Sequence, residues 1–257
     1  PPLMAVNTTA GTGSELTRHA VITNEEDHLK FVVVSWRNIP LVSFNDPMLM
    51  LGVPKSVTAA TGCDAFVQAI EPYVSVDHNS ITDSQCKEAI QLIQEALPEA
   101  VANGQNVEAR TKMVEAEMLA GMAFNNANLG YVHAMAHQLG GQYDAPHGVC
   151  CALLLTTVEE YNLIACPDRF AELARIMGYD TTGLTTMQAA EKSIDGMREM
   201  CKAVGIPSSI KAIGAKPEDF SLMAENALKD GNAFSNPRKG TKQDIIDLYQ
   251  KAYDGIY

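Results

Sequence analysis

The hydrophobic periodicity of this chain changes once, near Pro54, and that change constrains the fold more than any other feature of the sequence. Before it, β-branched residues form short runs separated by polar turns, a pattern typical of strands. After it, apolar residues recur at the spacing of amphipathic helices. The predicted strands are 3–7, 20–23, 31–34 and 41–44, and the predicted helices are 54–73, 81–102, 107–127, 148–162, 167–177, 185–204, 217–228 and 241–253.

These elements give a short β-rich segment followed by a helical domain of roughly 200 residues. The polar residues 24–27 indicate a turn, so we expect the strands on either side of it to form a hairpin. The first strand, 3–7, is apolar and would expose an edge unless upstream residues pair with it or cover it. We therefore expect residues that belong before Pro1, although a processed or engineered terminus accounts for the same pattern.

The composition argues against several classes of function. The 257 residues include 19 Lys+Arg and 31 Asp+Glu, a formal net charge of −12, and an acidic chain without a basic cluster repels a phosphate backbone. We therefore expect no nucleic-acid partner. The longest apolar run, 148–155, is far shorter than the ~20 residues of a membrane-spanning helix, so no membrane partner is expected. The spacing of the six cysteines fits neither a zinc knuckle nor a secreted disulfide framework, which favours reduced thiols in the cytoplasm.

A nearly uncharged stretch in the middle of the chain contains three of the six histidines. Between residues 118 and 158 the only Asp, Glu, Lys or Arg is Asp144. His133 and His137 are four residues apart and would share one face of a helix, and the turn before His147 can bring that side chain back toward the same face. A lone histidine in apolar surroundings is usually a satisfied core residue, but three in one uncharged segment favour a metal or catalytic cluster.

Asp64 is the only Asp, Glu, Lys or Arg between Lys55 and Glu71, within a predicted apolar helix. It lies beyond the first turn, so helix capping explains it poorly, and a buried carboxylate needs a cation or strong donors. A buried salt bridge to an arginine and ligation of a metal ion fit its position equally well. Together with two histidines, Asp64 would supply three protein ligands and leave one coordination position open, as in catalytic metal sites.

The segment 8–15, Thr-Thr-Ala-Gly-Thr-Gly-Ser-Glu, combines small residues with hydroxyl groups. Such a segment lets backbone amides approach an anion, as phosphate-binding loops do. It matches neither the glycine fingerprint of dinucleotide-binding folds nor a P-loop. A nucleotide contact and a simple tight turn are both consistent with it.

Taken together, these residues resemble the iron-containing alcohol dehydrogenase family, and within it the 1,3-propanediol and methanol dehydrogenases. The resemblance extends over essentially the whole chain and is carried by the runs at 7–15, 58–65, 121–141, 146–149 and 229–238. It implies the C-terminal part of an α/β dinucleotide-binding domain over residues 1–47, followed by a large all-α metal-binding and catalytic domain over residues 48–257. The metal would lie in the cleft between the two.

The resemblance also implies roles for individual residues. Asp64, His133 and His147 would be ligands of a divalent cation, Fe²⁺ or Zn²⁺, and His137 would lie beside the nicotinamide and the substrate. NAD or NADP would be contacted by the following residues: Thr8, Thr9, Thr12, Gly13, Ser14 and Lys30. The implied reaction interconverts small primary alcohols or diols, such as 1,3-propanediol, with aldehydes, and the implied assembly is a homo-oligomer.

Departures from the family pattern bear on this expectation, and one of them is Thr156 and Thr157, which stand where the family usually has Pro-His. Gln68 stands where the family usually has a histidine, one helical turn after Asp64, and we expect its amide to face the metal position as a weak ligand. The family's glycine-rich pyrophosphate loop should lie upstream of Pro1. One hypothesis is therefore an active metal- and NAD(P)-dependent alcohol dehydrogenase. The alternative is a catalytically impaired homologue that has lost a metal ligand and keeps a structural or assembly role.

Overall fold

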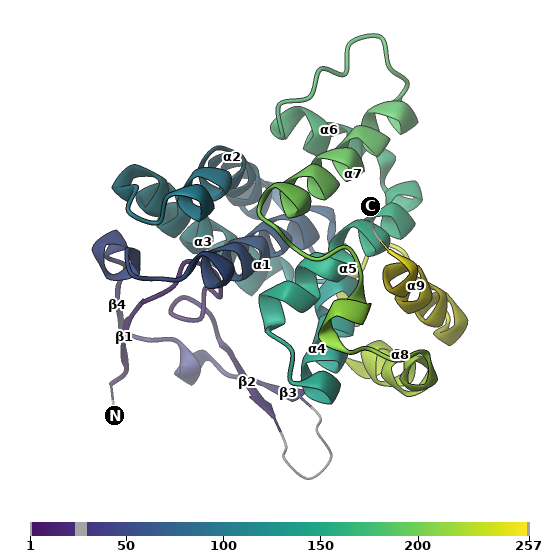
Figure 1. Cartoon of the computed structure of the whole chain (residues 1–257), viewed down its shortest axis with the longest axis horizontal. Helices are drawn as coiled ribbons and strands as arrows, with labels where there is room; N and C mark the ends of the chain where they lie inside the picture. The colour runs from purple at the N-terminus through teal and green to yellow at the C-terminus, as the bar shows by residue number, and fades with distance from the viewer. Residues whose placement is uncertain (1, 24–29, 256–257) are drawn as a thin grey trace.

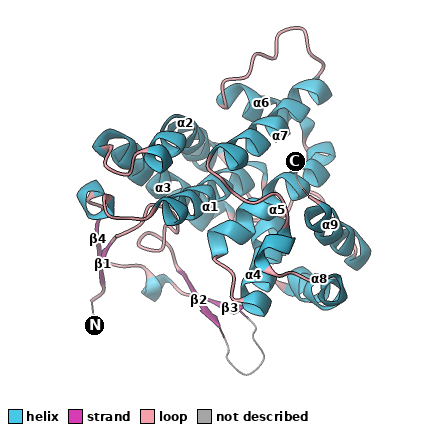
Figure 2. Cartoon of the chain, viewed as in Figure 1, coloured by secondary structure: helices cyan, strands magenta, loops and turns pink. Residues whose placement is uncertain are grey.

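In the computed structural model, which describes residues 2–23 and 30–255, the described strands all precede a helical domain (Figures 1 and 2). The strands are β1 (Met4–Val6), β2 (His19–Thr23), β3 (Lys30–Val34) and β4 (Val42–Phe44). The α-helices are α1 (Lys55–Val74), α2 (Ser80–Ala102), α3 (Val107–Ala127), α4 (Tyr131–Tyr143), α5 (His147–Asn162), α6 (Pro167–Ile176), α7 (Thr186–Ala203), α8 (Phe220–Lys229) and α9 (Lys242–Asp254). The predicted order of a β-rich segment and an all-helical domain is confirmed.

The described strands form two separate pairs. β2 and β3 pair antiparallel, with Val21 opposite Val32, which confirms the predicted hairpin; its predicted turn at 24–27 lies outside the described residues. β1 and β4 pair in parallel. This second pair presents apolar side chains to the surface: Met4, Val6, Val42 and Phe44.

Helix α1 packs against α2, α3 and α5 and lies at the centre of the helical domain (Figure 1). Every residue from 62 to 74 on this helix is buried, including the polar side chains of Asp64, Gln68 and Glu71. Their spacing of four and then three residues places them on one face of the helix. Because buried polar groups require partners, the elements that pack on this face determine what it can bind.

The first turn of α5 lies very close to α1. A Cβ atom on Gly148 would be 2.1 Å from the backbone oxygen of Ala60 and 3.3 Å from the Cβ of Asp64. A glycine is therefore required at this contact, because any side chain would push the two helices apart. The contact brings His147, the first residue of α5, beside Asp64.

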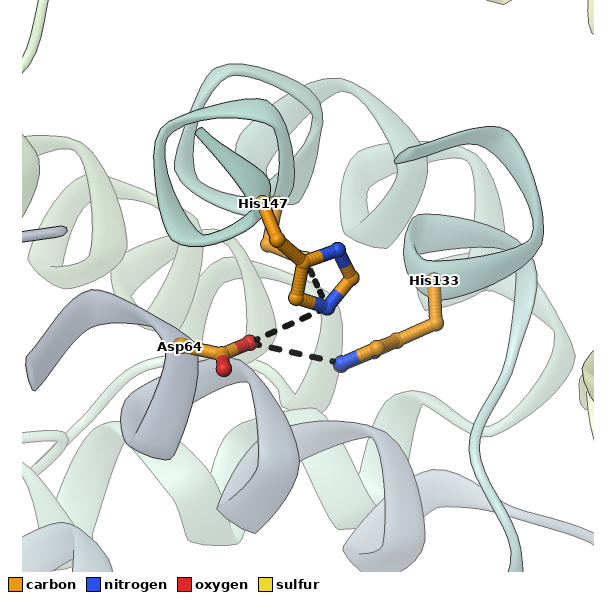
Figure 3. Close-up of side chains that lie close together, drawn as sticks. Asp64, His133 and His147 are labelled. Carbon is orange, nitrogen blue, oxygen red and sulfur yellow. Dashed lines mark hydrogen bonds and ion pairs between the residues drawn. The ribbon is translucent and has the colours of Figure 1, made fainter. Parts of the chain in front are cut away.

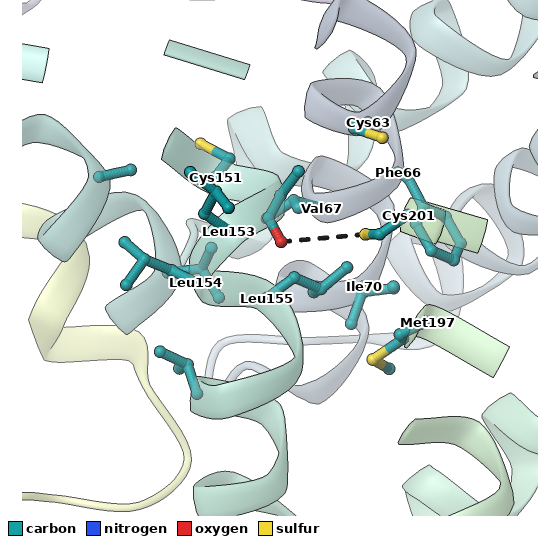
Figure 4. Close-up of a cluster of buried hydrophobic side chains, with 14 of the residues drawn as sticks. Cys63, Phe66, Val67, Ile70, Cys151, Leu153, Leu154, Leu155, Met197 and Cys201 are labelled. Carbon is teal, nitrogen blue, oxygen red and sulfur yellow. Dashed lines mark hydrogen bonds between the residues drawn. The ribbon is translucent and has the colours of Figure 1, made fainter. Parts of the chain in front are cut away.

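Helix α5 continues from this contact through the apolar core. Leu153, Leu154 and Leu155 are fully buried, in a cluster that includes Val67 and Met197 (Figure 4). The segment His147–Ala165 is long and apolar enough to cross a membrane by length and composition, but 67% of it is buried inside the structure. Its burial is what we expect of a helix at the centre of a helical domain.

Candidate metal centre

A cavity of about 530 Å³ lies between the β2–β3 hairpin and the helical domain. Its wall includes every side chain that the sequence analysis places at the metal or the substrate: Asp64, Gln68, His133, His137 and His147. These residues come from α1, α4 and the first residue of α5. Segments that are far apart in the sequence therefore meet at one wall of the cavity.

The side chains of Asp64, His133 and His147 converge on one point (Figure 3). Asp64 Oδ1 lies 3.5 Å from His133 Nε2 and 3.5 Å from His147 Nε2. Asp64 Oδ1 and His133 Nε2 are buried and have no hydrogen-bond partner in the described part of the chain. Two ligand atoms at tetrahedral angles on a zinc-sized ion lie roughly 3.3–3.6 Å apart, so the observed separations fit a shared cation better than direct hydrogen bonds.

The charge of Asp64 suits cation binding. Burial by itself raises the pKa of this carboxyl, but the nearby His147 and His133 outweigh burial and hold the pKa below its usual value. Asp64 is therefore a carboxylate in the interior of the protein. In the described part of the chain its ion pairs are with these histidines and not with an arginine, so the alternative of a buried Asp–Arg salt bridge is wrong.

Glu71 fixes the orientation of His133. Its Oε2 lies 2.5 Å from His133 Nδ1, and its Oε1 accepts a hydrogen bond of 2.7 Å from the backbone amide of Val132. With Nδ1 donating to this carboxylate, Nε2 is the ring nitrogen that can bind a metal, and it is the one that faces Asp64. The sequence analysis does not identify Glu71, although its position seven residues after Asp64 places it on the same helix face.

His137 lies one turn after His133 on α4, and the two rings are 6.3 Å apart. Its Nδ1 is 2.7 Å from Oδ2 of Asp230, at the C-terminal end of α8. Nε2 is then the ring nitrogen that can contact a molecule in the cavity. Asp230 is also missed as a site residue by the sequence analysis, because nothing in the sequence shows that the end of α8 lies against α4.

Gln68 lies on the cavity wall one turn after Asp64. Its side chain is buried, and its Oε1 has no hydrogen-bond partner among the described residues. Leaving a buried oxygen unpaired is costly, and a cation or a substrate hydroxyl would satisfy it.

Family models match both parts of the chain. The model described as "Fe-containing alcohol dehydrogenase family, C-terminal" matches residues 58–253, and the model described as "Iron-containing alcohol dehydrogenase" matches residues 1–47. The chain belongs to the iron-containing alcohol dehydrogenase family. The resemblance stated on the sequence motifs is thereby confirmed.

Named relatives in this family match almost all residues of the chain. The 1,3-propanediol dehydrogenase of Klebsiella pneumoniae is 58% identical over 253 residues, which are 98% of this chain and 65% of the relative. The NAD-dependent methanol dehydrogenase of Bacillus methanolicus is 44% identical over 251 residues, 98% of this chain and 66% of the relative. A solved structure of an alcohol dehydrogenase from Oenococcus oeni has a TM-score of 0.96 at 81% identity and covers 98% of this chain and 66% of that one. The chain thus spans about 65% of the length of the named relatives it matches.

The N-terminal loop of the chain brings only some of its predicted cofactor residues to the cavity. Thr12 and Ser14 line the cavity, and the Thr12 hydroxyl donates to Oγ of Ser14 at 3.0 Å. Thr8 and Thr9 are not among the described residues that line it. Lys30 begins β3, and its side chain lies outside the described part of the structure.

Gly13 has a packing role in this loop. It adopts φ +60°, and a Cβ there would be 3.0 Å from the Cα of Gly121 on α3. Its amide donates a hydrogen bond of 2.9 Å to Oε1 of Glu117, also on α3. This amide is therefore engaged with a protein carboxyl group, so the predicted cofactor contact of Gly13 cannot use it in this conformation. Burial and the proximity of Glu15 raise the pKa of Glu117 to about 8.

The sequence analysis also misses Cys151, which it treats only as a reduced thiol. Cys151 lies one turn after His147 on α5 and is completely buried. One potential ligand atom from each of Asp64, His133, His147 and Cys151 lies within 4.8 Å of every other. The four-residue spacing of His147 and Cys151 is the sequence feature that could have indicated this arrangement.

Proposed function

We propose that this chain carries the metal site of an NAD(P)-linked alcohol dehydrogenase that interconverts small primary alcohols or diols with aldehydes. The observation that carries the proposal is the convergence of Asp64, His133 and His147 on one point of a cavity that His137 also lines. The relatives named 1,3-propanediol dehydrogenase and NAD-dependent methanol dehydrogenase support the reaction and the class of substrate.

In this proposal, Asp64, His133 and His147 hold a divalent cation, either Fe²⁺ or Zn²⁺. When bound, the cation would supply Lewis-acid polarisation of the substrate oxygen, and a nicotinamide cofactor would supply the hydride chemistry. Glu71 keeps the His133 ring in the orientation that directs Nε2 toward Asp64. The charge of Asp64 offsets part of the cation's charge inside the protein, where an unpaired ion is unstable.

His137 is the group that we propose exchanges a proton with the substrate oxygen. Asp230 holds its Nδ1 at 2.7 Å, so Nε2 can accept or donate a proton at the cavity. The wall also has apolar side chains that can pack against a short aliphatic chain. These are Ala20, Val21, Val32, Phe124 and Leu129. We assign Thr12 and Ser14, which line the same cavity, to contacts with the cofactor.

The test is metal-dependent turnover. After removal of bound metal by a chelator, the protein is supplied with Zn²⁺ or Fe²⁺, and NADH or NADPH formation is followed with 1,3-propanediol, ethanol and methanol. We expect turnover only with metal, and its loss in Asp64→Asn and His147→Ala. Turnover that is the same with and without metal would contradict the proposal. Metal and cofactor binding without turnover would instead favour the alternative, a catalytically impaired homologue. That alternative is suggested by Gln68, which stands where the family usually has a histidine.

A further inference from the structure

Helix α5 offers a second potential ligand to the point where Asp64, His133 and His147 meet. Cys151 lies one helical turn after His147, so the two side chains leave the same face of α5. Its Sγ is 3.6 Å from His147 Nε2. A thiolate and an imidazole bound to one zinc ion at tetrahedral angles lie roughly 3.5–3.6 Å apart, so this separation suits two ligands of the same ion.

Two potential metal-ligand atoms at the same point are buried without a hydrogen-bond partner among the described residues, as the ligands of a cation would be. Asp64 is 3% exposed and His133 is 2% exposed, yet Asp64 Oδ1 and His133 Nε2 have no hydrogen-bond partner among the described residues. Buried polar atoms are seldom left unpaired. One potential ligand atom from each of Asp64 and His133 lies within 4.8 Å of Cys151 Sγ, so the sulfur borders the position that a cation would fill.

We propose that the thiolate of Cys151 is a fourth protein ligand of the metal, an inference that rests on the proposed metal site. On binding, the thiol gives its proton to solvent as the metal–sulfur bond forms. Two anionic ligands, Asp64 and Cys151, then balance the two charges of the cation, while His133 and His147 bind as neutral imidazoles. The neutral amide oxygen of Gln68 lies on the same wall but is a weaker ligand than a thiolate.

This ligand set changes which metal the site prefers. Thiolates favour zinc over hard cations, and zinc is also above Fe²⁺ in the general order of affinity. One carboxylate, two imidazoles and one thiolate are all ligands that zinc accepts, and the substrate oxygen of the proposed reaction would then enter as a fifth ligand, a coordination number that catalytic zinc can reach. The site is therefore expected to retain Zn²⁺ in the presence of Fe²⁺, even though the family is named for iron.

The alternative role for Cys151 is that of a small apolar residue in the core, where it belongs to the same buried cluster as Val67 and Leu153 (Figure 4). Cobalt distinguishes the two roles, because Co²⁺ bound to a thiolate has a charge-transfer band in the near ultraviolet. We expect this band when Co²⁺ is added to the metal-free protein. We expect Cys151→Ser to lose the band while keeping the visible bands of bound Co²⁺, and Cys150→Ser, the adjacent buried cysteine, to keep both.

Zinc binding provides a second measurement. In Cys151→Ser, affinity for Zn²⁺ should fall by at least about tenfold, because even the loss of a residue that only orients a metal ligand lowers affinity by about 10–100-fold. Cys150→Ser should bind Zn²⁺ with the affinity of the parent protein. X-ray absorption at the zinc edge of the unmodified protein should show one sulfur at about 2.3 Å. That measurement needs no substitution, so it remains decisive if Cys151→Ser does not fold.

Two failures are distinguishable. If Co²⁺ and Zn²⁺ bind the unmodified protein but the charge-transfer band and the zinc–sulfur distance are absent, Cys151 is not a ligand and the three-residue site stands. If neither metal binds, the proposed function itself fails, and the inference fails with it.

Discussion

His133 is held through its Nδ1 by the carboxylate of Glu71 at 2.5 Å, and both side chains are almost completely buried. The same carboxylate accepts a hydrogen bond from the first turn of α4, the helix that carries His133. One residue of α1 therefore fixes both the start of α4 and the orientation of its imidazole. We therefore expect Glu71 to influence metal affinity through the orientation of His133, although it is not a metal ligand itself.

We expect Glu71→Gln to weaken Zn²⁺ binding by roughly 10–100-fold, the usual range for residues that orient a ligating histidine. An amide is a poorer acceptor than a carboxylate for the Nδ1 proton. Zinc titration against a competing chelator measures the change, and circular dichroism shows whether the variant is folded. Glu88→Gln, on the exposed side of α2, is the control. A folded Glu71→Gln variant with the parent affinity would show that Glu71 does not position His133.

Gln68→His should increase metal affinity, and more for Fe²⁺ than for Zn²⁺. The amide oxygen of Gln68 is buried on the cavity wall without a described partner, and an imidazole there would be a stronger ligand for either metal. Zinc is usually satisfied by four ligands, whereas non-haem Fe²⁺ sites have further open positions, so Fe²⁺ gains more from an added imidazole. We expect the unmodified protein to bind zinc more readily than iron.

Metal analysis and titration with each ion compare Gln68→His with the parent protein. Gln91→His, which adds an exposed histidine on α2, controls for non-specific binding. If the parent protein already holds stoichiometric iron tightly and Gln68→His changes nothing, Gln68 does not face the metal.

Gly148→Ala should separate His147 from Asp64. The added Cβ would be 2.1 Å from the backbone oxygen of Ala60, and backbone atoms cannot move aside as a flexible side chain can. We expect a loss of stability of about 1–3 kcal/mol together with weaker Zn²⁺ binding. Chemical denaturation and zinc titration measure the two effects. Gly52→Ala, where an added Cβ has no atom within 4 Å, should leave both unchanged; parent zinc affinity in Gly148→Ala would count against the role of this contact.

The stability of the protein should depend on the protonation of Glu117. Its pKa is raised from 4.5 to about 8, chiefly by burial, so the folded state favours the neutral acid. The stabilisation is fully present below about pH 4.5 and is lost as the pH rises through about 8. Glu117→Gln keeps a neutral side chain that can still accept the hydrogen bond from Gly13. Relative to the parent, it should therefore become more stable as the pH rises across this range.

One pKa unit corresponds to about 1.4 kcal/mol, so we expect a relative gain on the order of 2–4 kcal/mol for Glu117→Gln between pH 4.5 and pH 8. Urea unfolding of both proteins at a series of pH values measures the difference. Glu108→Gln, at a side chain that is 82% exposed, should show no such trend. A constant difference between Glu117→Gln and the parent across this range would mean that Glu117 is ionised in the folded protein.

The sequence by itself determined the elements and the chemical types of residue at the site. Its periodicity predicted eight of the nine described α-helices to within three residues at each end, all but α4, because burial of one apolar face forces a repeat that is visible in the chain. The same spacing placed His133 and His137 on one helix face. The absence of other charges marked Asp64 as a buried carboxylate, because an unpaired buried charge is costly enough to be rare without a function.

The tertiary structure alone decided which of these residues meet and what else meets them. The partnership of Glu71 with His133 and of Asp230 with His137 depends on rotations and separations of helices that no local pattern specifies. Gly13 shows the same limit, since its amide is used by Glu117, over a hundred residues away. Helix periodicity shows which side of a helix is buried, whereas contacts between helices follow from packing over the whole core. One such contact, the close approach of Gly148 to Ala60, sets the position of the proposed ligand His147.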